Sequence, residues 1–266
     1  MTATLLQDLT LLKDAIEAGA EIARSYYLNG ARVWDKGRGQ GPVTQADLAV
    51  DALLQQRLRE ARPDYGWLSE ETADDPARMK AARAWIVDPI DGTRSFIRQR
   101  PQWTVCGALI EHNKPVAGVV VNPMTNETFV ASIGGGAELN GVAIHVSNPT
   151  SLERARLMGP KDFYAHPSWP EPWPETLILD NPGSIAYRLC LIASGARDGT
   201  VRSFSCHEWD VAAGDLIVRE AGGLMTSLDG GPIGYNKPNP VLQGYIAAGP
   251  SLYPELKRRL DLRAGA

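Results

Sequence analysis

Apolar residues recur at helical spacing at the start of the chain, and the pattern predicts an amphipathic helix over residues 4 to 28 that ends near Asn29-Gly30. The positions on its apolar face are Leu5, Leu9, Leu12, Ile16 and Ala23. A glycine-rich polar stretch, WDKGRGQGP, follows. Thr44 then has the character of an N-cap, with Asp47 in the first turn, so a second helix is predicted from there to a point before Arg62-Pro63.

Segments typical of strands follow the second helix. Residues 84 to 88 are typical of a buried strand, and the segments VCGALIE and VAGVVVN flank a turn at residues 112–115, which predicts a hairpin. ETFVASI is typical of a further strand, which ends at the glycines 134–136. The first half is therefore predicted to pack two helices against a largely antiparallel sheet.

The second half alternates between strand and helix patterns. LILD, TVRSF, LMTSL and YIAAG are predicted strands; IAYRLCLIASGA, WDVAAGDLIVREAGG and a segment near residues 251 to 260 are predicted helices. Residues 160 to 176 contain too many prolines for regular structure, and we expect a surface loop there. This alternation favours an α/β layer. We therefore predict an α+β half over residues 1–150 and an α/β half over residues 151–266.

Composition and charge narrow the class of partner. The 266 residues are 44% hydrophobic and 22% charged, as in ordinary globular proteins. The formal net charge of -4 gives no support to a nucleic-acid-binding surface, so we expect metal cations or a small ligand and no nucleic-acid polymer. No apolar stretch approaches the ~20 residues that a membrane span needs, so no membrane partner is expected.

The cysteines and the N-terminus indicate the compartment. Cys106, Cys190 and Cys206 are odd in number and lack C-x-x-C spacing, which argues against a disulfide framework or a zinc ribbon and fits a reducing cytoplasm. The first residues lack the basic region of a signal peptide. A cytoplasmic location is therefore predicted.

The segment WIVDPIDGTRSF places two carboxylates where a buried strand ends. Asp88 and Asp91 can point into one cleft, Pro89 fixes the backbone between them, and the Ile90 carbonyl is left free as a neutral ligand. These are the oxygen ligands that magnesium prefers. Gly92 and the residue after it then open a helix, whose N–H groups can bind phosphate.

Two further acidic residues fit the same site. Glu70 lies in WLSEET, and Asp210 lies at the start of the helix in HEWDVAAGD. Four carboxylates in one pocket are unfavourable without cations, because like charges raise one another's pKa. Taken alone, the D-P-x-D-G motif is also compatible with a simple turn and helix cap. Asp47 could likewise be only an acidic residue that stabilises the first turn of its helix.

Together these residues give the chain a family resemblance. It resembles the inositol monophosphatase superfamily, the magnesium-dependent, lithium-sensitive phosphomonoesterases, in motifs that extend from Thr44 to Gly223. The matching motifs are D-P-I-D-G-T at 88–93, E-E at 70–71, W-D at 209–210 and A-G-G at 221–223. The resemblance implies the five-layered α/β/α/β/α sandwich of sugar phosphatases, and homodimers are common in that family.

The resemblance also implies roles for the residues. Two or three Mg²⁺ ions would bind to Glu70, Asp88, the Ile90 carbonyl, Asp91 and Asp210. Thr93 paired with Asp47 would orient or deprotonate the attacking water, with Glu70 as the third catalytic residue. The substrate would contact Gly92, Thr93, Ser184, Arg188 and Asp210. Glu71 is expected in a salt bridge.

Local choices within the family favour one substrate over another. Ser69, Glu208 and Arg188 are similar to residues of 3'(2'),5'-bisphosphate nucleotidases, and Arg188 could balance a second phosphate. Ser203 stands where inositol monophosphatases tend to have a glutamate. The sequence therefore favours 3'-phosphoadenosine 5'-phosphate. The alternatives are inositol 1-phosphate, then histidinol or sugar phosphates, and last a non-catalytic metal-binding protein.

Overall fold

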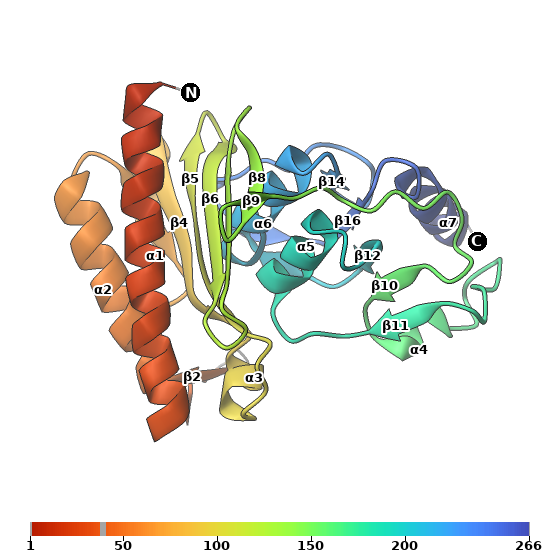
Figure 1. Ribbon diagram of the computed structural model, residues 1–266, viewed down its shortest axis with the longest axis horizontal. Helices are drawn as coiled ribbons and strands as arrows, with labels where there is room; N and C mark the ends of the chain where they lie inside the picture. Colours follow the sequence, from red (N-terminus) through yellow and green to blue (C-terminus); the bar gives the residue numbers. More distant parts are fainter. Residues whose placement is uncertain (1, 38–40, 266) are drawn as a thin grey trace.

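Helices and β-sheets alternate in five layers across the computed structural model, which describes residues 2–37 and 41–265 (Figure 1). In order, the helical layers are α1 (Ala3–Asn29) with α2 (Gln45–Ala61), α5 (Ile185–Ala193) with α6 (Glu208–Glu220), and α7 (Tyr253–Ala264) with the short α4 (Lys161–Tyr164). The predicted five-layered sandwich is confirmed. Residues 38–40 of the glycine-rich stretch lie outside the described residues.

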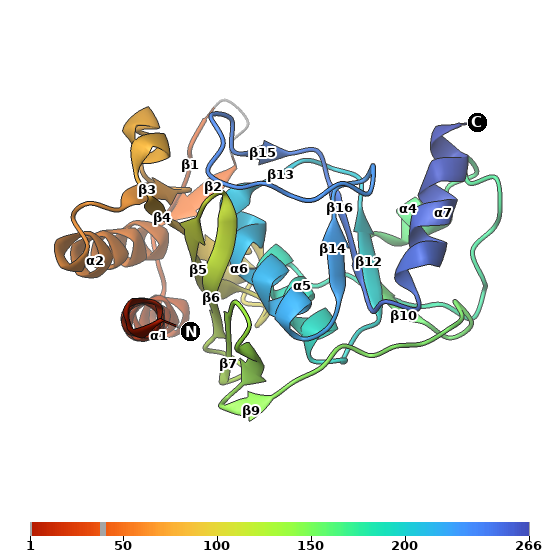
Figure 2. The same cartoon turned by 90° about the horizontal axis from the view of Figure 1, so that it is seen from above.

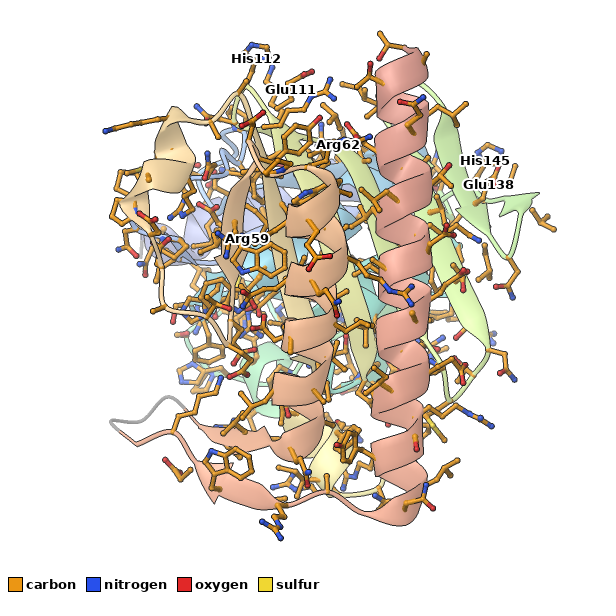
Figure 3. The ribbon with its side chains drawn as sticks, turned by 90° about the vertical axis from the view of Figure 1, so that its left-hand side faces the viewer. Arg59, Arg62, Glu111, His112, Glu138 and His145 are labelled. Atoms are coloured by element: carbon orange, nitrogen blue, oxygen red, sulfur yellow. The ribbon has the colours of Figure 1, made fainter. Side chains whose placement is uncertain are left out.

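The two outer helices lie side by side over one face of the first sheet (Figure 3). Asp8 of α1 is fully buried, and its carboxylate accepts hydrogen bonds from Arg62 Nε and Arg83 Nη1, each at 2.7 Å. These two ion pairs join α1 to the end of α2 and to the sheet. The predicted cap of α2 is confirmed, because the Thr44 side chain and the Asp47 carboxylate each accept from the other's backbone N–H.

The first sheet, within the described residues, has seven strands in chain order and is antiparallel except between its first two strands. The strands are β3 (Gly66–Ser69), β4 (Arg83–Asp91), β5 (Thr104–Glu111), β6 (Lys114–Asn122), β7 (Glu127–Ser132), β8 (Gly136–Leu139) and β9 (Val142–Ala143). The predicted β5–β6 hairpin is confirmed. Strand β4 is longer than expected, since pairing with β5 resumes at Asp91 after an irregularity that begins at Asp88.

The second sheet has the order β11-β10-β12-β16-β14 in the part of the chain that the structure describes. Its strands are β10 (Arg156–Met158), β11 (Ile178–Asp180), β12 (Gly199–Arg202), β14 (Leu224–Thr226) and β16 (Tyr245–Ala248). Strand β10 pairs in parallel with β11 and β12, whereas β16 pairs antiparallel with β12 and β14. The α/β character predicted for this half is confirmed. The minor elements are β1 (Val33–Asp35), β2 (Pro42–Thr44), the 3-10 turn η1 (Pro76–Lys80), α3 (Thr93–Ile97), β13 (Cys206–His207) and β15 (Val241–Leu242).

The proline-rich residues 160–176 differ from the expected surface loop. Four of their aromatic side chains are buried in edge-to-face pairs beneath α7. They are Phe163, Tyr164, Trp169 and Trp173. The indole of Trp169 donates to the Phe163 carbonyl at 2.6 Å, so interlocked rings order a segment whose composition indicates a loop.

Helices α5 and α6 lie between the two sheets, as Figure 2 shows from above. The largest apolar cluster joins their side chains to Ile86 and Val120 of the first sheet and to Tyr245 of the second. The two sheets therefore share one core, and the division at residue 150 stays a prediction. The three cysteines are buried and free, as expected.

Candidate active site

Three aspartates from distant parts of the sequence meet at the ends of their elements. Asp88 and Asp91 close strand β4, and Asp210 lies in the first turn of α6. A carboxylate oxygen from each lies within 4.8 Å of those of the other two. The structure thus brings together the two aspartates of D-P-I-D-G-T and the aspartate of W-D, a donor set that fits a hard cation.

Asp88 has the environment that most requires a cation. Its Oδ1 accepts the Ile90 N–H at 2.9 Å, whereas its Oδ2 is buried and has no hydrogen-bond partner among the described residues. Burial, together with the charges of neighbouring acids, raises the pKa of this carboxyl well above its usual range. Leaving a buried carboxylate oxygen unpaired is unfavourable, so the side chain is suited to share a positive ion.

Asp91 is held in place by the start of α5. Its Oδ2 accepts from Ser184 Oγ at 2.5 Å and from the Ala186 N–H at 2.6 Å. Burial raises its pKa to about 6, and these two hydrogen bonds act in the opposite direction. The contacts fix one carboxylate oxygen and leave the other for the cavity.

Ser184 does not have the position expected for a substrate contact. It is the N-cap of α5, accepts the Tyr187 N–H at 2.9 Å, lies 3.0 Å from Thr104 Oγ1, and is fully buried behind Asp91. The expected direct contact is therefore corrected to a positioning one. A capping side chain folds back onto its own helix end, which keeps it out of the cavity.

Asp210 is positioned by its own helix. Its Oδ2 accepts the His207 N–H at 2.7 Å, and burial raises its pKa well above the usual range, with the charge of Asp91 acting in the same direction. The His207 ring is stacked on Trp209 with centroids 4.4 Å apart, so this histidine has an aromatic neighbour.

Glu70 lines the same cavity, but its carboxylate lies outside the cluster that the three aspartates form. Its Oε1 accepts from Lys36 Nζ at 2.9 Å, and the same ammonium donates to Glu71 Oε1 at 2.7 Å. The salt bridge expected for Glu71 is therefore present. Lys36 was not found from the sequence, because a single lysine in a polar stretch gives no signal of its distant partners.

The Thr93 hydroxyl lies between two acceptors. Its Oγ1 is 3.3 Å from Asp47 Oδ1 and 3.0 Å from the Ile90 carbonyl oxygen. The other oxygen of Asp47 accepts from the Thr44 N–H and hydroxyl at 2.8 and 2.6 Å, and burial raises the pKa of Asp47 to about 6. The expected Thr93–Asp47 pair is thus present, although the single hydroxyl proton can be donated to only one of the two acceptors at a time.

A cavity of about 770 Å³ opens above these carboxylates. Gly92 lines it at φ +96°, a conformation that favours glycine, and an added Cβ would lie only 3.1 Å from the Gln102 carbonyl oxygen. Helix α3 begins here as predicted but spans only five residues, so its macrodipole is weak. Arg94, Arg98 and Arg100 line the wall instead and provide the positive charge. The three arginines of the segment RSFIRQR, which follows the aspartate motif directly, are the sequence signal of this positive charge.

Comparison with known proteins identifies the same family along the chain. The model of the inositol monophosphatase family matches residues 6–261. A Haemophilus influenzae protein named Nus factor SuhB is 34% identical over 227 residues, which cover 83% of this chain and 84% of that protein. An inositol-1-monophosphatase from Synechocystis is 32% identical over 225 residues, covering 82% and 77%.

Solved structures agree with the fold. The Thermotoga maritima IMPase superposes with a TM-score of 0.82 at 26% identity and covers 99% of both chains. The extragenic suppressor protein suhB from Bartonella henselae superposes with a TM-score of 0.81 at 30% identity, covering 94% of this chain and 97% of its own.

These comparisons correct two expectations. The exclusion of nucleic-acid polymers as partners is wrong, because relatives of this chain are named as Nus factors and not only as phosphatases. The inositol phosphatase alternative is also better supported than the nucleotidase interpretation.

In the part of the chain that the structure describes, no helix is both long and apolar enough to span a membrane.

Proposed function

Because the chain belongs to the inositol monophosphatase family, and is accordingly a phosphatase that hydrolyses phosphomonoesters, we propose that it uses Mg²⁺ and acts on inositol 1-phosphate. One observation supports the metal most directly. The buried Oδ2 of Asp88 has no partner among the described residues and lies within a cluster of three carboxylates. A divalent cation would satisfy it.

The donor set fits magnesium rather than a softer metal. It consists of carboxylates and the Ile90 carbonyl, and oxygen ligands are the ones that magnesium selects. We propose that Asp88, Asp91 and Asp210 hold two or three ions together with Glu70. Magnesium in such a site supplies Lewis-acid stabilisation of the phosphoryl oxygens.

The chain's own side chains prepare the water and the substrate. When the Thr93 hydroxyl donates to Asp47, its oxygen can accept a hydrogen bond from a water in the cavity. As that water loses a proton to Thr93, the proton of the Thr93 hydroxyl passes to the Asp47 carboxylate, which becomes neutral. Arg94 and its neighbours attract the phosphate to the cavity.

Two of the three residues that favoured a nucleotidase, Ser69 and Glu208, have structural partners instead, whereas Arg188 lines the cavity. Ser69 Oγ donates to Asp51 Oδ1 at 2.6 Å, and buried Glu208 accepts the N–H groups of Asn236 and Lys237 at 2.6 and 3.1 Å. Neither residue lines the cavity. They therefore do not distinguish substrates, which leaves the inositol phosphatase relatives as the better guide.

Phosphate release from inositol 1-phosphate, with 3'-phosphoadenosine 5'-phosphate, histidinol phosphate and a sugar phosphate in parallel, tests the proposal. We expect inositol 1-phosphate to be hydrolysed with magnesium and not after chelation. Activity that survives chelation would reject the metal, and a preference for the nucleotide would reject the substrate. Inhibition by lithium, a homodimer and a cytoplasmic location stay predictions.

A further inference from the structure

A row of polar side chains one turn apart runs along α2 and consists of Asp47, Asp51 and Gln55. Asp47 belongs to the site through its pair with Thr93. Asp51 is only 6% exposed and does not line the catalytic cavity. Two like charges four positions apart destabilise a helix, so the stability of α2 does not explain a carboxylate at position 51.

Asp51 holds both ends of the segment that carries Glu70. Its Oδ1 accepts from Ser69 Oγ at 2.6 Å, and its Oδ2 accepts from Thr72 Oγ1 at 2.7 Å. Ser69 is the last residue of β3 and precedes Glu70, whereas Thr72 follows Glu71. One carboxylate on α2 therefore fixes the residues on either side of the two glutamates.

The same contacts form a connected hydrogen-bond network. Ser69 Oγ accepts the Glu71 N–H at 3.3 Å, and Thr72 Oγ1 accepts from Gln55 Nε2 at 2.6 Å. Gln55 Nε2 also lies 2.9 Å from Asp51 Oδ2. The three side chains that donate to Asp51 are neutral, and hydrogen bonds to a charged acceptor are roughly twice as strong as those between neutral groups. The charge of Asp51 thus strengthens every contact of the network.

Glu70 depends on this support more than the clustered aspartates do. Each of the three aspartates accepts a backbone N–H, from Ile90, Ala186 or His207, which fixes its carboxylate. The Glu70 carboxylate accepts instead from the Lys36 ammonium, which Glu71 shares. An ammonium is a point charge on a long stem and imposes little direction. The backbone on both sides of Glu70 must therefore set where this side chain points.

We propose that Asp51 is a positioning residue of the site, which holds the backbone around Glu70 through Ser69 and Thr72 and thereby sets the affinity for divalent cations. This inference rests on the proposed magnesium-dependent function and deepens it. A glutamate on a loosely held segment would have to become ordered when a cation binds, and that ordering is unfavourable. The contacts of Asp51 remove this cost in advance.

D51N tests the inference, because a neutral amide then replaces the charged acceptor. We expect the magnesium concentration for half-saturation to rise by about 10-fold, the lower end of the effect of residues that support metal ligands. Calorimetric titration of the substrate-free protein with magnesium should show this increase, and so should the magnesium dependence of phosphate release. The kcat at saturating magnesium should stay close to that of the wild type. D51E keeps the charge and should recover part of the affinity.

S69A and T72V each remove one hydroxyl donor and leave the Asp51 carboxylate in place. Each should weaken magnesium binding by a smaller factor than D51N does. The double variant D51N/T72V should bind magnesium no more weakly than D51N, because both substitutions break the same contact. These variants also carry the test if D51N does not fold, since unchanged magnesium affinity in both S69A and T72V would overturn the inference.

D198N is the matched control. Asp198 is also buried, accepts from Ser147 Oγ at 2.6 Å and does not line the catalytic cavity. It should lower the melting temperature and leave the magnesium affinity unchanged. A D51N protein that behaves in the same way would show a merely structural role for Asp51 and overturn the inference, while the proposed function stands. A wild type that binds no magnesium would reject the proposed function and this inference with it.

Discussion

The Asp88 carboxylate is the point at which sequence, burial and chemistry meet most closely. In D88N we expect phosphate release to fall by on the order of 100-fold or more, because even outer partners of metal ligands contribute ~10–100-fold. Removing one negative charge from the cluster should leave the variant no less stable than the wild type in chelator. Its melting temperature should no longer rise with magnesium. Thermal scans with and without magnesium, beside a phosphate assay, measure both effects, and near-normal turnover would contradict the shared-ligand role.

Ser184 offers a subtler test, because it joins a helix cap to Asp91. In S184A the loss of the cap should cost about 1 kcal/mol of unfolding free energy. The pKa of Asp91 should also rise, since the Ser184 hydrogen bond lowers it. The magnesium concentration for half-maximal rate should increase by ~10–100-fold. T2A is the matched control, because Thr2 caps α1 through the Leu5 N–H at 3.2 Å, remote from the site. An unchanged magnesium requirement in S184A would remove Ser184 from the positioning of Asp91.

At the scale of residues, the sequence predicts contacts between positions that are close along the chain and does not predict contacts between distant ones. Asp88 and Asp91 are three positions apart on one strand, so their meeting follows from the motif itself. Asp210 was first proposed as a further carboxylate of the same pocket, and the family resemblance then gave it the role of a metal ligand. The contacts of Lys36 with Glu70 and Glu71 link segments far apart in the chain, and no spacing indicates them.

At the scale of elements, Asp198 fastens strand β10 to the start of β12. Its carboxylate accepts from the Arg156 N–H at 2.7 Å, from the Arg156 guanidinium and from Ser147 Oγ, both at 2.6 Å. Burial on its own would raise the pKa of Asp198, but these hydrogen bonds outweigh it and lower the pKa. The stabilisation is therefore complete above the ordinary aspartate pKa and is lost as the pH falls through the lower folded-state value.

D198N should consequently destabilise the fold by about 1–3 kcal/mol near neutral pH. The difference from the wild type should shrink as the pH falls below ~4, where the wild-type carboxylate also becomes protonated. Urea unfolding at several pH values measures it. D261N is the control, because Asp261 is 60% exposed beside Lys257 and should change stability little at any pH. A pH-independent difference would show that the charge of Asp198 is not what stabilises the strand pair.

Elements with a clear periodicity were predicted well, and the exceptions have physical causes. The cap of α2, the β5–β6 hairpin and the central helices follow from local pattern. Residues 160–176 do not, because the order there comes from Trp169 and Trp173 packing on α7 and not from backbone preference. The extension of β4 through Pro89 depends on its partner β5, which the apolar run alone does not reveal.

At the scale of the whole molecule, the acidic site lies where the first sheet meets the helical layer between the two sheets. Asp88 and Asp91 come from the first sheet, Asp210 comes from a helix packed between the sheets, and α5 holds Asp91 from the same middle layer. The apolar core is likewise shared by both sheets. Whatever binds the aspartates is thus coupled to the unfolding of the entire chain.

Magnesium should therefore stabilise the protein as one unit. At a hundredfold excess over its dissociation constant the expected gain in unfolding free energy is about 2.7 kcal/mol. Calorimetry should show a single transition with and without the ion, moved to higher temperature by magnesium and insensitive to it in D88N. Two transitions, of which magnesium shifts only one, would mean that two parts of the chain unfold separately and that the ion binds to one of them. We expect a single transition, because α5 and α6 pack against both sheets.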